Sequence, residues 1–251
     1  MRSPICYQDR QHALCFEPPS YTIEQLLDTA LCGSLSVNRG QTMANIVGPF
    51  GFAQWGTASG PVNYAENHSP QYRIASTYTT AIFYGDAVRL WVSGDTSTSS
   101  AGYIIQWTAA DGSATKILSG IFVGCSYYST SQRKRVYNNY WPGSDATGDV
   151  DAYIVDDPNA LFKVQAATGP ITQASIGFGA DIASTPLGNT TTGISTMALT
   201  TPSSGSAATL PFKVVNVLTS PPGANGTDLT TAYNYVIVSL NNQQYKTQTG
   251  A

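Results

Sequence analysis

Two long apolar runs, residues 120–128 and 150–165, flank a Trp-Pro-Gly corner that begins at Trp141. Apolar runs of this length, bounded by turn-forming residues, are typical of β-strands. No catalytic grouping lies in or between them. The pattern therefore favours a β protein that works by shape and contact.

The same pattern of short strand-like runs continues through most of the chain. Residues 72–94 alternate between apolar and polar positions, and residues 102–120 predict a hairpin with Asp111-Gly112 at its turn. Further strand-like runs occupy residues 176–182, 210–218 and 233–240. Strands at such regular spacing predict an all-β fold, a jelly-roll-like β-sandwich or barrel, rather than βαβ units.

The N-terminal residues differ in texture and divide the chain into three parts. Residues 1–42 predict an extended arm with one short helix, because apolar residues recur at helical spacing between Ile23 and Leu31. Residues 43–70 predict an extended tether, and residues 71–251 the β-rich body. Met43 offers an alternative start of translation, in which case residues 1–42 would be leader sequence. We expect an arm that reaches onto a partner.

Charge is scarce, since only 11% of the residues are charged and the formal net charge is −3. This balance gives no reason to expect nucleic-acid binding. The one basic cluster, Arg133-Lys134-Arg135, is interpreted as a solvated hairpin tip. No apolar run reaches the roughly 20 residues that a membrane-spanning helix requires, and no secretory signal is expected at the N-terminus.

Residues capable of catalysis or metal binding are few and scattered. The histidines His12 and His68 lie far from any nucleophile pattern, and the four cysteines lack the spacing of a zinc site, so we interpret the cysteines as free thiols. The best acidic cluster leaves calcium open as an alternative: Asp149, Asp151, Asp156 and Asp157. We expect no catalytic residues, no cofactor and no metal. Aromatic residues near Trp141 leave a carbohydrate platform open as well.

Several short motifs occur in an order that resembles capsid decoration (cement) proteins of tailed bacteriophages. These motifs are PFGF, YRIASTYTTAIFYGDAVRL, GIFVGCSYYS, YWPG, DAYIVDDPNALFKVQA and TTGIS, and they span the chain from about Met43 to its end. The resemblance implies an all-β body that binds the outer surface of an assembled head and braces the major capsid protein. The resemblance also implies that the protein is made in the bacterial cytoplasm and is located on the virion.

We expect capsid contacts along the tether and self-association through aromatic side chains. The predicted capsid contacts are Ala44, Asn45, Ile46, Val47, Pro49, Phe50, Phe52 and Trp55. The predicted self-association residues are Tyr137, Tyr140 and Trp141. A homotrimer is the expected assembly, with a homodimer as the alternative; nucleic acid and membrane are not expected partners. The main alternative function is a phage tail or receptor-binding protein that recognises a host glycan, and an enzyme such as a depolymerase is disfavoured.

Overall fold

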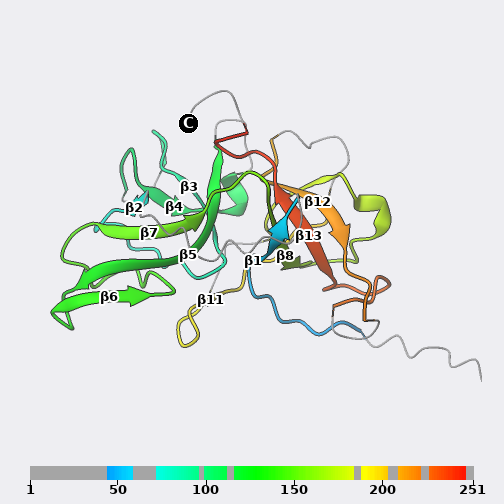
Figure 1. Cartoon of the computed structure of the whole chain (residues 1–251), viewed down its shortest axis with the longest axis horizontal. Helices are drawn as coiled ribbons and strands as arrows, with labels where there is room; N and C mark the ends of the chain where they lie inside the picture. The colour runs from blue at the N-terminus through cyan, green and yellow to red at the C-terminus, as the bar shows by residue number, and fades with distance from the viewer. Residues whose placement is uncertain are drawn as a thin grey trace, which may run out of the picture. The chain divides into compact units, whose positions relative to one another are not determined.

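The computed structural model confirms the all-β class, with two antiparallel sheets (Figure 1). It describes residues 44–58, 72–95, 99–111, 116–183, 188–202, 209–221 and 226–246, all within the unit Thr42–Ala251. The helix predicted between Ile23 and Leu31 and both histidines lie outside these residues. In the part described, the only helical turns are two 3-10 segments, Ala109–Asp111 and Gln173–Ser175.

The first sheet, named here the β13 sheet, has five strands in the order β1-β8-β13-β12-β9. They run over Ala53–Thr57 (β1), Ala160–Gln165 (β8), Tyr235–Leu240 (β13), Phe212–Val217 (β12) and Gly179–Ala180 (β9). Alternate residues of its central strands face inward, as period-2 patterning requires. Val236 and Val238 of β13 are fully buried, and Phe162 of the neighbouring β8 is 1% exposed.

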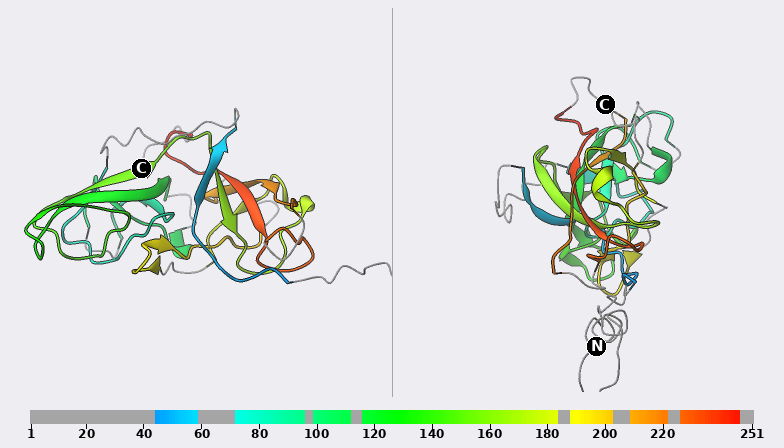
Figure 2. Two further views of the ribbon diagram at one scale, coloured as in Figure 1. Left: turned by 60° about the horizontal axis from the view of Figure 1, so that its bottom comes forward. Right: turned by 90° about the vertical axis from the view of Figure 1, so that its right-hand side faces the viewer.

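The second sheet, named the β5 sheet, has the order β2-β7-β5-β3-β4, and β6 also pairs with β5. Its strands are Tyr72–Ile74 (β2), Val150–Val155 (β7), Leu118–Ser129 (β5), Ala87–Leu90 (β3), Ile104–Gln106 (β4) and Lys134–Asn138 (β6). A separate pair is formed by Gly188–Asn189 (β10) and Ile194–Ser195 (β11). Figure 2 shows the sheets from two further directions.

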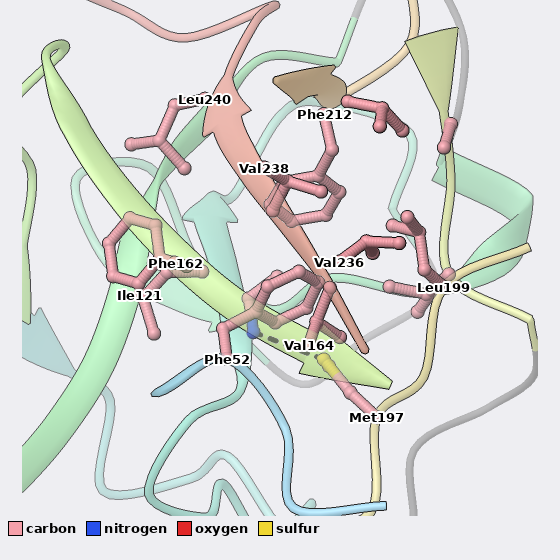
Figure 3. Packing of buried hydrophobic residues seen from close by; sticks show 14 of the residues in the cluster. Phe52, Ile121, Phe162, Val164, Met197, Leu199, Phe212, Val236, Val238 and Leu240 are labelled. Carbon is pink, nitrogen blue, oxygen red and sulfur yellow. Dashed lines mark hydrogen bonds between the residues drawn. The ribbon is translucent and has the colours of Figure 1, made fainter. Parts of the chain in front are cut away.

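Two hydrophobic clusters meet at strand β5. Ile121 belongs to the cluster that lies against the β13 sheet, whereas its neighbour Phe122 belongs to the cluster under the β5 sheet. Successive residues of a strand point to opposite faces, so one long strand contributes to both cores. Figure 3 shows the first cluster, in which Phe52 stacks on Phe212 at 4.2 Å between ring centroids. Each fully buried aromatic or aliphatic side chain stabilises the fold by about 1.5–3 kcal/mol.

The segment that follows β13 connects the two sheets through hydrogen bonds. Leu118 N donates to Asn242 O and Gln244 N donates to Leu118 O, each at 3.0 Å. Gln243 is fully buried, and its Nε2 donates to Asp156 O at 3.0 Å. The chain that leaves one sheet thus forms hydrogen bonds to the first residue of β5 and to the residue that follows β7.

Two local predictions are wrong. The expected hairpin over residues 102–120 does not form, because β4 and β5 both pair with β3, which lies between them. The expected irregular tether contains a regular strand, since β1 pairs with β8 from Ala53 to Thr57. The strand-like runs at 120–128 and 150–165 are confirmed as β5, β7 and β8, and β6 completes a hairpin whose exposed end carries Arg133 to Arg135.

Candidate functional site

Residues 44–52 form an extended segment that is fixed to the body by the side chain of Asn45. Asn45 is only 5% exposed. Its Nδ2 donates to Asp228 O at 2.8 Å and to Ala232 O at 3.0 Å, and its Oδ1 accepts from Gly226 N at 3.0 Å. A carboxamide both donates and accepts, so this one side chain satisfies three backbone groups of the turn before β13.

A second carboxamide, Gln165 at the end of β8, holds the next part of the segment. Its Nε2 donates to Ile46 O at 2.9 Å, and its Oε1 accepts from Gly48 N at 3.0 Å. The same Nε2 donates to Tyr233 O at 3.0 Å. Gln165 is 1% exposed, so these hydrogen bonds are largely shielded from competing water. These hydrogen bonds, named here the Gln165 clamp, fix the backbone on both sides of Val47.

The clamped backbone presents two adjacent apolar side chains to solvent. Ile46 is 70% exposed and Val47 is 60% exposed. Exposed apolar side chains scattered singly are ordinary on protein surfaces. Here two of them are consecutive residues on a stretch of backbone that buried amides hold in place. The segment therefore offers a preorganised apolar contact, which lowers the entropy that a partner must remove on binding.

The second half of the segment packs against the body through the ring of Phe50 and approaches it closely at Gly51. Phe50 packs edge-on against Tyr235 at 5.5 Å between centroids, and Lys163 Nζ lies 5.1 Å from both rings. At Gly51 the backbone has φ +71°, and a Cβ there would lie 2.7 Å from Gly85 O. Only glycine fits so close an approach.

Strand β1 adds a further exposed aromatic residue. The register with β8 shifts between Gln54 and Gly56, so Trp55 is the extra residue of a β-bulge. Trp55 is 53% exposed. No strand pairs with the other side of β1 among the described residues, so Trp55 lies on an open edge of the β13 sheet.

The predicted capsid contacts therefore divide by exposure. Ala44, Ile46, Val47 and Trp55 are exposed, and Pro49 and Phe50 are half-buried. Asn45 and Phe52 are buried and hold the segment instead of facing a partner.

The three predicted self-association residues do not share one surface. Tyr137 is 72% exposed, whereas Tyr140 is half-buried and stacks on Phe83 at 5.5 Å. Trp141 is fully buried, and its Nε1 donates to Tyr78 O at 3.1 Å. The corner that follows Trp141 places Gly143 at φ +84°, where a Cβ would lie 2.2 Å from Thr79 O. Trp141 is thus a core residue of this fold.

The four carboxylates considered for calcium have separate partners. Tyr103 OH donates to Asp149 at 2.6 Å and Arg135 to Asp151 at 2.6 Å, while Asp157 accepts from Asn159 N at 2.7 Å. Tyr72 OH donates to Asp156 at 3.3 Å. Across the described ranges, no group of three or more His, Cys, Asp or Glu side chains is arranged to hold a metal ion.

A buried ion network lies at the β3–β4 edge of the β5 sheet. Arg89 bonds both oxygens of Asp95 at 2.7 and 2.8 Å and one oxygen of Asp111 at 3.0 Å. Lys116 Nζ lies 2.6 Å from Asp111 and 3.3 Å from Asp95. Burial opposes ionisation of Asp95, but the bonds from Arg89 prevail and lower its pKa to about 2. These charges compensate one another, so we assign the network to stability.

Asp86, between β3 and the preceding turn, is fully buried, and no cationic side chain of the described residues forms an ion pair with it. Its Oδ2 accepts from Phe83 N at 2.8 Å and from Gln106 Nε2 at 2.6 Å. Burial raises the pKa of Asp86 to about 6 against the opposing effect of these donors. Its carboxyl group is fully buried and bonded to groups of the protein itself, so we assign it to the structure of the fold.

Comparison with known protein families, with curated proteins and with solved structures gives no match for this chain. No helix in the described part has the length and apolarity to cross a membrane.

Proposed function

We propose that this protein is a decoration, or cement, protein that binds the outer surface of an assembled phage head. The proposal rests on the motif order of the sequence together with one structural observation: the apolar pair Ile46–Val47 is held in solvent by the buried amides of Asn45 and Gln165. A fold that holds exposed apolar side chains in place in this way can bind a complementary surface at a low cost in conformational entropy.

In this role the extended segment 44–52 docks on the major capsid protein, and the β body covers the neighbouring shell. A ligand that binds only the assembled state shifts the equilibrium toward assembly. Many copies, each of modest affinity, then stabilise the head together. Self-association into a trimer, with a dimer as the alternative, would bring several segments to one symmetry position.

The test is co-sedimentation of the full chain with purified heads of the virus that encodes it. We expect wild-type protein to saturate the heads, and the double variant Ile46→Ser/Val47→Ser to bind about tenfold more weakly or worse. Val215→Ser is the matched control, because Val215 is 40% exposed on β12, outside the segment. Wild-type protein that leaves heads unoccupied would rule out the proposal. Equal occupancy by the double variant and the control would rule out the segment as the docking site.

A further inference from the structure

Among the described residues, part of one face of the β5 sheet is exposed to solvent. The end of this face that carries Ile121 and Val155 is covered, because both side chains pack into the core against the β13 sheet. Farther along the strands, the same face carries the exposed side chains Tyr128 and Tyr137. Pairing aligns one rung across four strands: Arg73, Asp151, Ser126 and Tyr137. On one side of this rung Tyr153 pairs with Gly124, and on the other side Tyr128 pairs with Arg135.

The planar side chains of this face are held rigidly. Arg135 Nη2 donates to Asp151 Oδ2 at 2.6 Å and to Ser126 Oγ at 2.9 Å. Its guanidinium carbon lies 5.7 Å from the ring centroid of Tyr137. Tyr128 OH donates to the carbonyl oxygen of Arg133 at 2.8 Å, which fixes the orientation of that ring.

These fixed groups remain accessible. Tyr137 is 72% and Tyr128 is 54% exposed, and the side chain of Arg135 is 53% exposed. Side chains that are both ordered and exposed bind a ligand at a low cost in conformational entropy.

The positive and negative charges of the face nearly balance, and this balance limits which class of ligand the face can bind. Asp151 pairs with Arg135 at 2.6 Å and lies 4.0 Å from Arg73. Among the described residues, this end of the sheet carries four cationic and three acidic side chains: Arg73, Arg133, Lys134, Arg135, Asp145, Asp149 and Asp151. A nucleic acid or another polyanion binds through cations that are free to neutralise phosphates or sulfates. Here a single carboxylate, Asp151, pairs with Arg135 at 2.6 Å and lies 4.0 Å from Arg73, so it partly neutralises both arginines.

A protein partner fits this face less well, although tyrosine and arginine are enriched at protein interfaces. The core of a protein interface is depleted of charged residues and rich in apolar area. Among the described residues of this open face, the large hydrophobic side chains that are exposed are the two tyrosines Tyr128 and Tyr137. A ligand for this face must present apolar patches to the rings and hydroxyl groups to the charged side chains.

We propose that this face binds a neutral oligosaccharide or polysaccharide. The C–H faces of sugar rings stack on Tyr137 and Tyr128. Vicinal hydroxyls, which both donate and accept, meet the guanidinium donors of Arg135 and Arg73 and the carboxylate acceptor of Asp151. The inference does not depend on the proposed function, because the face lies on other strands than the segment 44–52.

The test is affinity electrophoresis of the full chain through native gels that contain dextran, soluble starch, galactomannan or mixed-linkage β-glucan, together with a glycan array. Gels with heparin and with oligo(dT) provide the polyanion comparison. We expect retention by at least one neutral glycan, and a loss of affinity of about tenfold or more for Tyr137→Ala and for Arg135→Ala. Both side chains are exposed, so the variants should keep the wild-type melting temperature.

Trp55→Ala is the matched control, since Trp55 is an aromatic residue on another sheet and, at 53%, is about as exposed as Tyr128 at 54%. Its glycan affinity should equal that of the wild type. The inference is overturned if no neutral glycan is bound, if heparin or oligo(dT) is bound in preference, or if Trp55→Ala weakens binding as much as Tyr137→Ala. It is also overturned if Tyr137→Ala abolishes self-association in sedimentation while glycan retention is unchanged.

Discussion

Gln165 Nε2 donates a hydrogen bond of 2.9 Å to the carbonyl oxygen of Ile46, a residue 119 positions earlier in the chain. The bond joins the end of a core strand to the segment that exposes Ile46 and Val47. Because the same amide also accepts from Gly48 N at 3.0 Å, it replaces the pairing that a neighbouring strand would supply. The exposed apolar pair is therefore a consequence of a buried polar contact.

Gln165→Leu should release this segment. The substitution leaves Ile46 O, Gly48 N and Tyr233 O without their partner, and we expect a loss of about 2 kcal/mol in the free energy of unfolding. Urea unfolding measures the loss, and hydrogen exchange of the Gly48 amide measures the release. Gln132→Leu is the control, because Gln132 is exposed in the β5–β6 turn. A Gly48 amide that stays protected in Gln165→Leu would show that the clamp is unimportant.

Removal of Arg89 from the buried ion network should destabilise the protein more than removal of Lys116. Arg89→Leu leaves the two buried carboxylates Asp95 and Asp111 with the partly exposed Lys116 as their shared cation, and we expect it to cost about 3–5 kcal/mol. Lys116→Leu leaves Arg89 in place, and the Lys116 side chain is 24% exposed, so we expect about 1 kcal/mol or less. Denaturant unfolding of both variants at neutral pH gives the comparison. Equal losses would mean that Arg89 is not the central charge.

Strands with clear alternation could be predicted from the sequence, and their pairing could not. Residues 150–165 carry inward-facing apolar side chains at every second position, as in Ala160 and Phe162, and they form β7 and β8. The Asp111-Gly112 signal predicts a hairpin between the strands on either side of it. Asp111 instead bonds Arg89 of β3, which occupies the position between β4 and β5. A local turn signal does not reveal such a third strand.

The candidate site shows the same limit. Apolar residues of segment 44–55 could be identified from the sequence, but Phe52 is a core residue and Ile46 is exposed. Their difference depends on the side chains of Asn45 and Gln165, which act across long sequence separations. A glutamine at the end of a strand carries no local signal of such a role. The open face of the β5 sheet could not be predicted from the sequence for a similar reason. Arg73, Asp151 and Tyr137 come together only through the strand order.

Cys125 should resist alkylation in the folded protein. The residue is 1% exposed, and burial raises the pKa of its thiol to about 12. The thiolate is the reactive form, so at about pH 8 the folded protein presents almost none of it at this position. Iodoacetamide treatment followed by peptide mass mapping should find Cys125 unmodified before unfolding and modified after it. Modification at equal rates in both states would contradict the buried position.

Asp86 should make stability depend on pH between about pH 4 and pH 6. Its carboxyl group has a pKa of about 6 in the folded protein, above the ordinary value of 3.8. In this range the folded state binds more protons than the unfolded state. The contribution of Asp86 to the free energy of unfolding is therefore full below about pH 4 and falls as pH rises toward 6, by on the order of 3 kcal/mol in total.

Asp86→Asn removes the titrating group while keeping an oxygen that accepts from Phe83 N and Gln106 Nε2, which bond Asp86 Oδ2 in the wild type. We expect the variant to lose the decline between pH 4 and pH 6 and to be at least as stable as the wild type at about pH 8. Urea unfolding at several pH values gives the difference between the two proteins, in which the other titrating groups cancel. Asp95 does not confuse the result, because its pKa of about 2 places its own effect at lower pH, where stability falls with acid. A difference curve that is flat from pH 4 to pH 6 would mean that Asp86 ionises in the folded protein as it does in the unfolded chain.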